Sequence, residues 1–144
     1  KKNYNISVTK EYLENSLVDT KDLFRESYHN QEIIHMIVNK YLINGKTQLL
    51  FEENLKCENF ALEVNFKSIS NDIIYDLNKI LENYQIKISK YLDGSYVKKN
   101  FKNDIELSEM SYRISCGHNQ NEVMFVPKNT KKLAFFEKFF QLFS

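Results

Sequence analysis

Residues 60–84 have the sequence FALEVNFKSISNDIIYDLNKILENY, in which the spacing of the large apolar residues changes near Ser70. Before Ser70, apolar side chains recur at every second position, which predicts a half-buried antiparallel strand over 60–67. After Ser70, the spacing of three to four residues predicts an amphipathic helix that continues to Tyr84. Ser70 is suited to cap this helix, and Asp72 and Asp76 suit its positive end.

Upstream of this stretch, the sequence predicts one more helix and one more long strand. Thr9 is a suitable N-cap for a helix that continues to Tyr28, since apolar residues recur there at helical spacing. The β-branched residues between Glu32 and Ile43 predict a strand, and Asn44-Gly45 predicts the turn that ends it.

Downstream, the pattern predicts shorter elements. Residues 86–92 suggest a short strand that ends at Asp93-Gly94, and residues 95–101 suggest one helical turn. We expect Asp104 to cap a third helix that carries Leu107, Met110 and Ile114. A polar loop over 117–121 and an edge strand over 122–126, ended by Pro127, complete the prediction.

These elements predict an α+β fold in which a small antiparallel or mixed sheet carries two amphipathic helices on one face. We expect one interaction domain over residues 1–127, followed by a basic linker and an amphipathic C-terminal helix over 128–144. The sequence begins at Lys1 rather than at methionine, as expected of a fragment or of a trimmed chain.

The composition argues against several classes of protein. The 144 residues carry a formal net charge of +1, so bulk electrostatic attraction to nucleic acid is not expected. The 3 glycines are isolated, and the sequence contains neither a P-loop nor a GxGxxG motif, so no cofactor is expected. Cys57 and Cys116 do not have CxxC spacing, and the sequence shows no secretory signal peptide. These features favour a cytoplasmic location and two unpaired thiols.

The C-terminal segment 133–144 holds five of the 11 phenylalanines. On a helix, Leu133, Phe136, Phe140 and Phe143 form one row, with further apolar residues beside it. Such a helix is about 18 Å long, too short to span a bilayer but suited to its interface. The expected membrane-binding residues are Leu133, Phe135, Phe136, Phe139, Phe140, Phe143, Lys131, Lys132 and Lys138. A core helix packed on the sheet and docking on a partner helix are the alternatives.

Residues that could carry chemistry are scattered. Cys116 and His118 lie two positions apart, but the sequence gives no trace of an orienting group or an oxyanion hole. Cys57, His29 and His35 lie on unrelated segments, so a metal site is not expected. His35 falls inside an apolar strand, where a hydrogen-bonded core histidine is the usual role.

Two surface features favour solvated charges over a binding site. The acidic pairs Glu52-Glu53 and Asp104-Glu106 are typical of loop or cap charges. Aromatic and basic residues are mixed between Tyr91 and Lys102. Such a mixture could bind single-stranded nucleic acid but is more typical of a solvated helix face.

Several of these segments resemble one family. The run VTKEYL at 8–13, the run EIIHMI at 32–37 and the run YLING at 41–45 resemble the start of the inserted subdomain of the bacterial cell-division FtsA family. The similarity continues to Gly94-Ser95-Tyr96 and covers residues 9–96, about 90 in all. Val38 stands where that family usually has proline, and Asn44 replaces its aspartate. The amphipathic tail is a second point of similarity.

The resemblance implies an adaptor without nucleotide chemistry. The glycine-rich phosphate loops of the FtsA actin-like core do not occur in residues 97–127. The expected partners are therefore division proteins and the inner leaflet of the cytoplasmic membrane, with self-association possible and no nucleic acid. A similar adaptor of the PilM pilus-assembly family and a small enzyme using Cys116 and His118 are the alternatives.

Overall fold

The computed structural model describes residues 5–101 and 105–123 of the chain. The expected membrane-binding residues, Asp104 and the expected strand beyond Val123 lie outside the described residues. The described elements, in chain order, are β1 (Ile6–Val8), α1 (Lys10–Ser27), β2 (Gln31–Ile43), β3 (Lys46–Gln48), β4 (Leu55–Cys57), β5 (Phe60–Ser70), α2 (Asn71–Glu82), α3 (Gly94–Lys99) and α4 (Leu107–Ser115).

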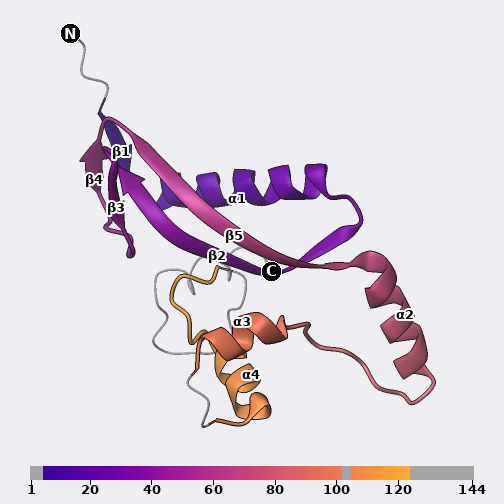
Figure 1. The fold of residues 1–144 in the computed structure, drawn as a ribbon. Helices are drawn as coiled ribbons and strands as arrows, with labels where there is room; N and C mark the ends of the chain where they lie inside the picture. Colours follow the sequence, from indigo (N-terminus) through magenta and orange to yellow (C-terminus); the bar gives the residue numbers. More distant parts are fainter. Residues whose placement is uncertain (1–4, 102–104, 124–144) are drawn as a thin grey trace. The chain divides into compact units, whose positions relative to one another are not determined.

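The predicted α+β class is confirmed. One antiparallel sheet pairs β1 with β4, and a second sheet has the strand order β3-β2-β5 (Figure 1). The described residues form two compact units, the first from residues up to His29 with Val38–Asn65 and the second from Asn30–Ile37 with residues from Phe66 onward. The two long strands β2 and β5 each contribute to both units.

In the first unit, local sequence signals determine the turns and caps. The Thr9 Oγ1 atom accepts a hydrogen bond from the Tyr12 N–H at 3.2 Å, which confirms the predicted cap of α1. Asn44 and Gly45 have φ angles of 50° and 76°, which the two-residue turn between β2 and β3 requires. The Asn44 side chain also accepts hydrogen bonds from the backbone N–H groups of Glu58 and Asn59.

The core of the first unit forms between α1 and the strands. Leu13 and Leu17 of α1 are buried, and the Tyr12 ring meets the Phe60 ring edge to face at 5.9 Å. Tyr41 is fully buried beside the rings of Phe51 and Phe60. The inner positions of β5 are half-buried and alternate with exposed ones, as the sequence predicts.

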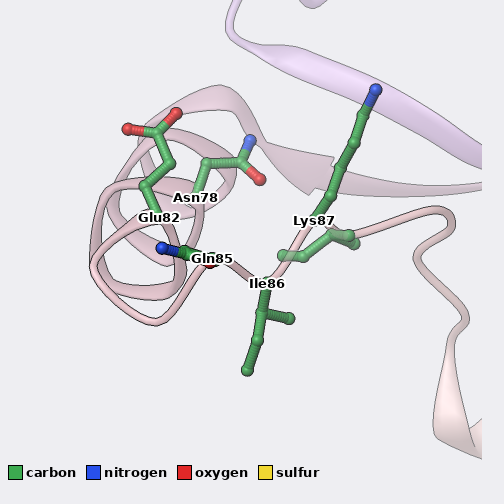
Figure 2. A pocket seen from close by; sticks show the side chains of 6 residues that line it. Asn78, Glu82, Gln85, Ile86 and Lys87 are labelled. Carbon is green, nitrogen blue, oxygen red and sulfur yellow. The ribbon is translucent and has the colours of Figure 1, made fainter.

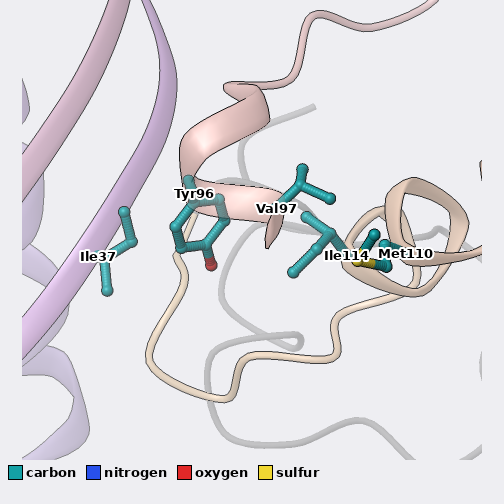
Figure 3. Close-up of a cluster of buried hydrophobic side chains, with 5 residues drawn as sticks. All are labelled: Ile37, Tyr96, Val97, Met110 and Ile114. Carbon is teal, nitrogen blue, oxygen red and sulfur yellow. The ribbon is translucent and has the colours of Figure 1, made fainter. Parts of the chain in front are cut away.

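In the second unit, α3 and α4 pack together on the first part of β2. Figure 3 shows the cluster, in which Ile37 comes from β2, Tyr96 and Val97 from α3, and Met110 and Ile114 from α4. Leu92, Phe101 and Ile105 pack against this cluster. The chain after α4 returns to β2, where the Val123 N–H donates to the Met36 carbonyl at 2.8 Å.

Two local predictions are wrong. Residues 86–92 form no strand, because the Ile86 N–H bonds back to the Leu81 carbonyl and the Asp93 N–H bonds to a histidine side chain. The N-cap of α4 is Glu106, which lies two residues beyond the predicted Asp104 and makes no side-chain capping bond. The helices themselves form where the apolar spacing places them.

Candidate functional site

The surface of α2 is the most unusual feature of the described residues. Ser70 caps this helix by accepting from the Asp72 N–H at 3.2 Å, yet no residue of α2 is buried. The helix therefore forms as predicted, but the packing of its apolar stripe onto the sheet is not seen among the described residues. The partly buried positions are Ile74, Asn78 and Leu81, which share one side of the helix.

A second side of α2 is apolar and exposed. Its residues, here called the α2 stripe, are Ile73 (51% exposed), Leu77 (38%), Ile80 (56%) and Tyr84 (71%), the last of which follows the end of the helix. They recur at intervals of four, three and four residues, the spacing by which paired helices interlock their side chains. Tyr75 and Lys79 lie on the opposite side, where the Lys79 Nζ atom sits 5.9 Å from the centre of the Tyr75 ring.

The end of α2 is fixed by its backbone. Gln85 adopts a left-handed φ of 57°, while the N–H groups of Gln85 and Ile86 bond back to the carbonyls of Glu82 and Leu81. This is the usual geometry of a helix C-terminus, although glycine normally occupies the left-handed position. The arrangement keeps Ile86, which is 54% exposed, close to the last turn of the helix.

A shallow groove of about 460 Å³ lies beside this end of the helix (Figure 2). Its lining residues are Asn78, Glu82, Gln85, Ile86, Lys87 and Ile88. The lining mixes amide, charged and aliphatic side chains, none of which is buried. The groove therefore continues the exposed surface around the end of α2 and does not form an enclosed pocket.

A buried polar network occupies the interior of the second unit. His35 is fully buried and Glu122 is 5% exposed, with 2.5 Å between the His35 Nδ1 atom and Glu122 Oε1. The Tyr96 hydroxyl donates to Glu122 Oε2 at 2.5 Å and accepts from the Asn119 amide at 2.9 Å. The Asp93 backbone N–H donates to His35 Nε2 at 2.9 Å.

The network assigns the proton positions. Because a backbone N–H can only donate, His35 Nε2 accepts and the ring carries its proton on Nδ1. Both oxygens of Glu122 then accept, one from His35 and one from Tyr96. Burial and the Glu122 carboxylate raise the pKa of Tyr96 above its usual value, since both disfavour a phenolate.

Asp93 connects this network to α3. Its carboxylate caps the helix by accepting from the Tyr96 N–H at 2.7 Å, and it also accepts from the Ser95 hydroxyl. The hydrogen bonds from the Ser95 hydroxyl and the Tyr96 N–H, together with the positive charge of the nearby Lys67, hold the pKa of Asp93 below its usual range. One short segment thus supplies both a helix cap and a partner for His35.

The geometry gives the hydrogen-bond network around His35 a structural role. A catalytic histidine needs a ring nitrogen open to a nucleophile or substrate, but here Nε2 faces a backbone N–H and Nδ1 faces Glu122. His35 is therefore the hydrogen-bonded core histidine that the sequence predicts. The sequence did not predict its partners, since Glu122 lies 87 positions away.

The other candidate residues do not converge. Cys116 is exposed, and the His118 ring stacks on the Phe101 ring with 4.5 Å between their centres. A hydrogen bond with Cys116 raises the pKa of the exposed Tyr112. Cys57 and Cys116 form no disulfide, and no group of metal-ligating side chains exists within residues 5–101 and 105–123.

The mixed aromatic and basic segment near α3 does not offer its aromatic residues to a ligand. Tyr96 is 7% exposed and bonds to Glu122, while Phe101 packs against the core cluster. Lys98 and Lys99 remain at the surface. This arrangement corresponds to the solvated helix face that the sequence favours.

Comparison with known proteins adds no relative. No protein-family model, no curated protein and no solved structure matches the chain. Among the helices that the structure describes, none combines the length and apolar character needed to cross a bilayer.

Proposed function

We propose that the chain is an adaptor-like interaction module, in which the α2 stripe binds an amphipathic helix of a partner protein. The observation that carries this proposal is the exposure of Ile73, Leu77, Ile80 and Tyr84 on a helix with no buried residue. Helix-in-groove recognition uses anchors at this spacing. The resemblance to the FtsA inserted subdomain gives the same expectation, with division proteins as partners.

The size of the α2 stripe suits a reversible contact. A fully buried side chain of this kind contributes about 1.5–3 kcal/mol, and these four are already partly shielded, so together they contribute about 3–6 kcal/mol. Association of two molecules costs about 4–15 kcal/mol. The stripe therefore needs additional contacts, such as those of the groove beside Ile86, before it holds a partner firmly.

Membrane attachment is the second half of the proposal. Residues 131–144, outside the described structure, combine phenylalanines with Lys131, Lys132 and Lys138, a pattern suited to the interface of an anionic leaflet. The proposed location is the cytoplasmic side of the membrane. We include no catalytic activity, and the occupied nitrogens of His35 support that choice.

Binding to anionic liposomes tests the membrane half. We expect the intact chain to co-sediment at low salt, to dissociate at high salt and to lose binding when Phe136 and Phe140 are both changed to lysine. Tyr75→Lys serves as the matched control, because it adds a charge to the side of α2 opposite the stripe, where Tyr75 is exposed. Unchanged binding of the Phe136/Phe140 variant would contradict membrane attachment through this segment.

Binding to purified division proteins, with pilus-assembly proteins in parallel, tests the partner half and separates the FtsA-like from the PilM-like alternative. Ile80→Lys should abolish the contact, whereas Tyr75→Lys should preserve it, because Tyr75 lies opposite the stripe on the same helix and is 64% exposed. Equal loss in both variants would argue against the stripe as the binding surface.

A further inference from the structure

We propose that the α2 stripe is a docking site for residues 133–144 of the same chain, which would cover it when no membrane or partner is present. This inference rests on the proposed function of the stripe as a helix-binding surface. It adds a regulatory step: the phenylalanine-rich segment would have to leave α2 before a partner could bind there.

The first argument is a match in spacing. The α2 stripe has four apolar residues at intervals of four, three and four. Leu133, Phe136, Phe140 and Phe143 recur at intervals of three, four and three. Both rows therefore alternate steps of three and four residues, as the apolar rows of paired helices do. Both segments are 12 residues long, so the two rows would have the same length.

The second argument is charge. Helix α2 carries three acidic residues, Asp72, Asp76 and Glu82, against the single basic residue Lys79. Residues 131–144 carry three basic residues, Lys131, Lys132 and Lys138, against the single acidic residue Glu137. Residues 133–144 alone have no net charge, so the attraction to the acidic α2 comes from Lys131 and Lys132, which directly precede them. A second copy of α2 would instead bring two acidic helices together.

The third argument concerns attachment within one chain. Without the additional contacts that a partner protein would supply, four partly shielded side chains give only a weak complex between separate molecules, because association costs translational and rotational freedom. Nine residues, 124–132, connect the described part of the chain to Leu133. A tether of this length gives an effective concentration in the millimolar range, which allows a small apolar contact to form.

Hydrogen exchange of the intact chain, measured by mass spectrometry without lipid, tests the inference. Phe140→Lys should speed the exchange of α2 amides about tenfold, because it removes the cover from that helix. Reciprocally, Ile80→Lys should speed the exchange of residues 133–144 by a similar factor. The matched controls are Gln141→Lys, at a polar position of the segment, and Tyr75→Lys, on the side of α2 opposite the stripe; both place the same charge away from the two rows.

The amides of α4 report global folding and should exchange equally in all variants. If Ile80→Lys also accelerates α4, Leu77→Ala is the milder variant to use. Wild-type exchange of α2 in Phe140→Lys, or equal effects in Gln141→Lys, would overturn the inference. An effect that disappears on dilution would also overturn it, because it would indicate a second copy. Failure of liposome binding would overturn the membrane proposal alone, since this experiment contains no lipid.

Discussion

The buried tyrosines Tyr96 and Tyr41 should respond oppositely to the same change. Tyr96 is 7% exposed, and its hydroxyl donates to Glu122 and accepts from Asn119. Tyr41 is fully buried, but its hydroxyl has no hydrogen-bond partner among the described residues. Tyr96→Phe therefore removes two hydrogen bonds, whereas Tyr41→Phe removes a buried polar group that none of the described residues satisfies.

The expected magnitudes follow from these contacts. A hydrogen bond to a charged group contributes about 1.5–3 kcal/mol and a neutral one about 0.5–1.5 kcal/mol, so Tyr96→Phe should lower the free energy of unfolding by about 2–4 kcal/mol. An unsatisfied buried hydroxyl costs about 1–3 kcal/mol, so Tyr41→Phe should raise the free energy of unfolding by about 1 kcal/mol.

Urea unfolding of the intact chain, followed by far-UV circular dichroism, measures both changes. The slope against urea should stay constant, so that a shift in midpoint reports stability. Destabilisation of less than about 0.5 kcal/mol by Tyr96→Phe would refute the network, because that is the range of ordinary surface substitutions. Equal destabilisation by the two variants would refute the distinction between a satisfied and an unsatisfied hydroxyl.

Two further predictions concern pH and a backbone angle. Burial raises the pKa of both Tyr41 and Tyr96, so the unfolded chain releases their protons near pH 10, before the folded chain does. The free energy of unfolding should therefore be constant below about pH 10 and fall above it by about 1.4 kcal/mol per pH unit for each tyrosine. Urea unfolding at several alkaline pH values measures this slope, and Tyr96→Phe should halve it. Gln85→Gly should raise the free energy of unfolding by about 0.5–1 kcal/mol, because glycine adopts the left-handed φ of 57° without strain. Thermal or urea unfolding measures this change, and a loss of stability would contradict the prediction.

Local signals made part of the fold predictable. The Thr9 and Ser70 caps and the Asn44-Gly45 turn depend on residues within a few positions, so their geometry follows from side-chain chemistry alone. The alternation in β5 is equally local, because it reflects one buried and one exposed face. These features required no knowledge of the rest of the chain.

Other elements depend on residues that are distant in the sequence, and they could not be predicted from local patterns. The strands β1, β3 and β4 have three residues each, too few for a periodic pattern, and β1 exists because it pairs with β4. The apolar residues of 86–92 suggested a strand, but the Asp93 N–H bonds to His35 instead of a neighbouring strand. Glu122 similarly gained its role from a contact with His35, which the spacing of the sequence does not encode.

The α2 stripe illustrates that sequence periodicity alone does not identify what the apolar side of a helix contacts. An amphipathic pattern predicts that a helix has an apolar side, but not whether that side meets its own core, another chain or a lipid. Here Ile74 and Leu81 are partly shielded, while Ile73 and Ile80, one position before each, are exposed. A single substitution at Ile80 should therefore affect docking with little cost to folding, whereas a charge at Leu81 should affect both. This separation is what makes the proposed binding surface accessible to mutational tests.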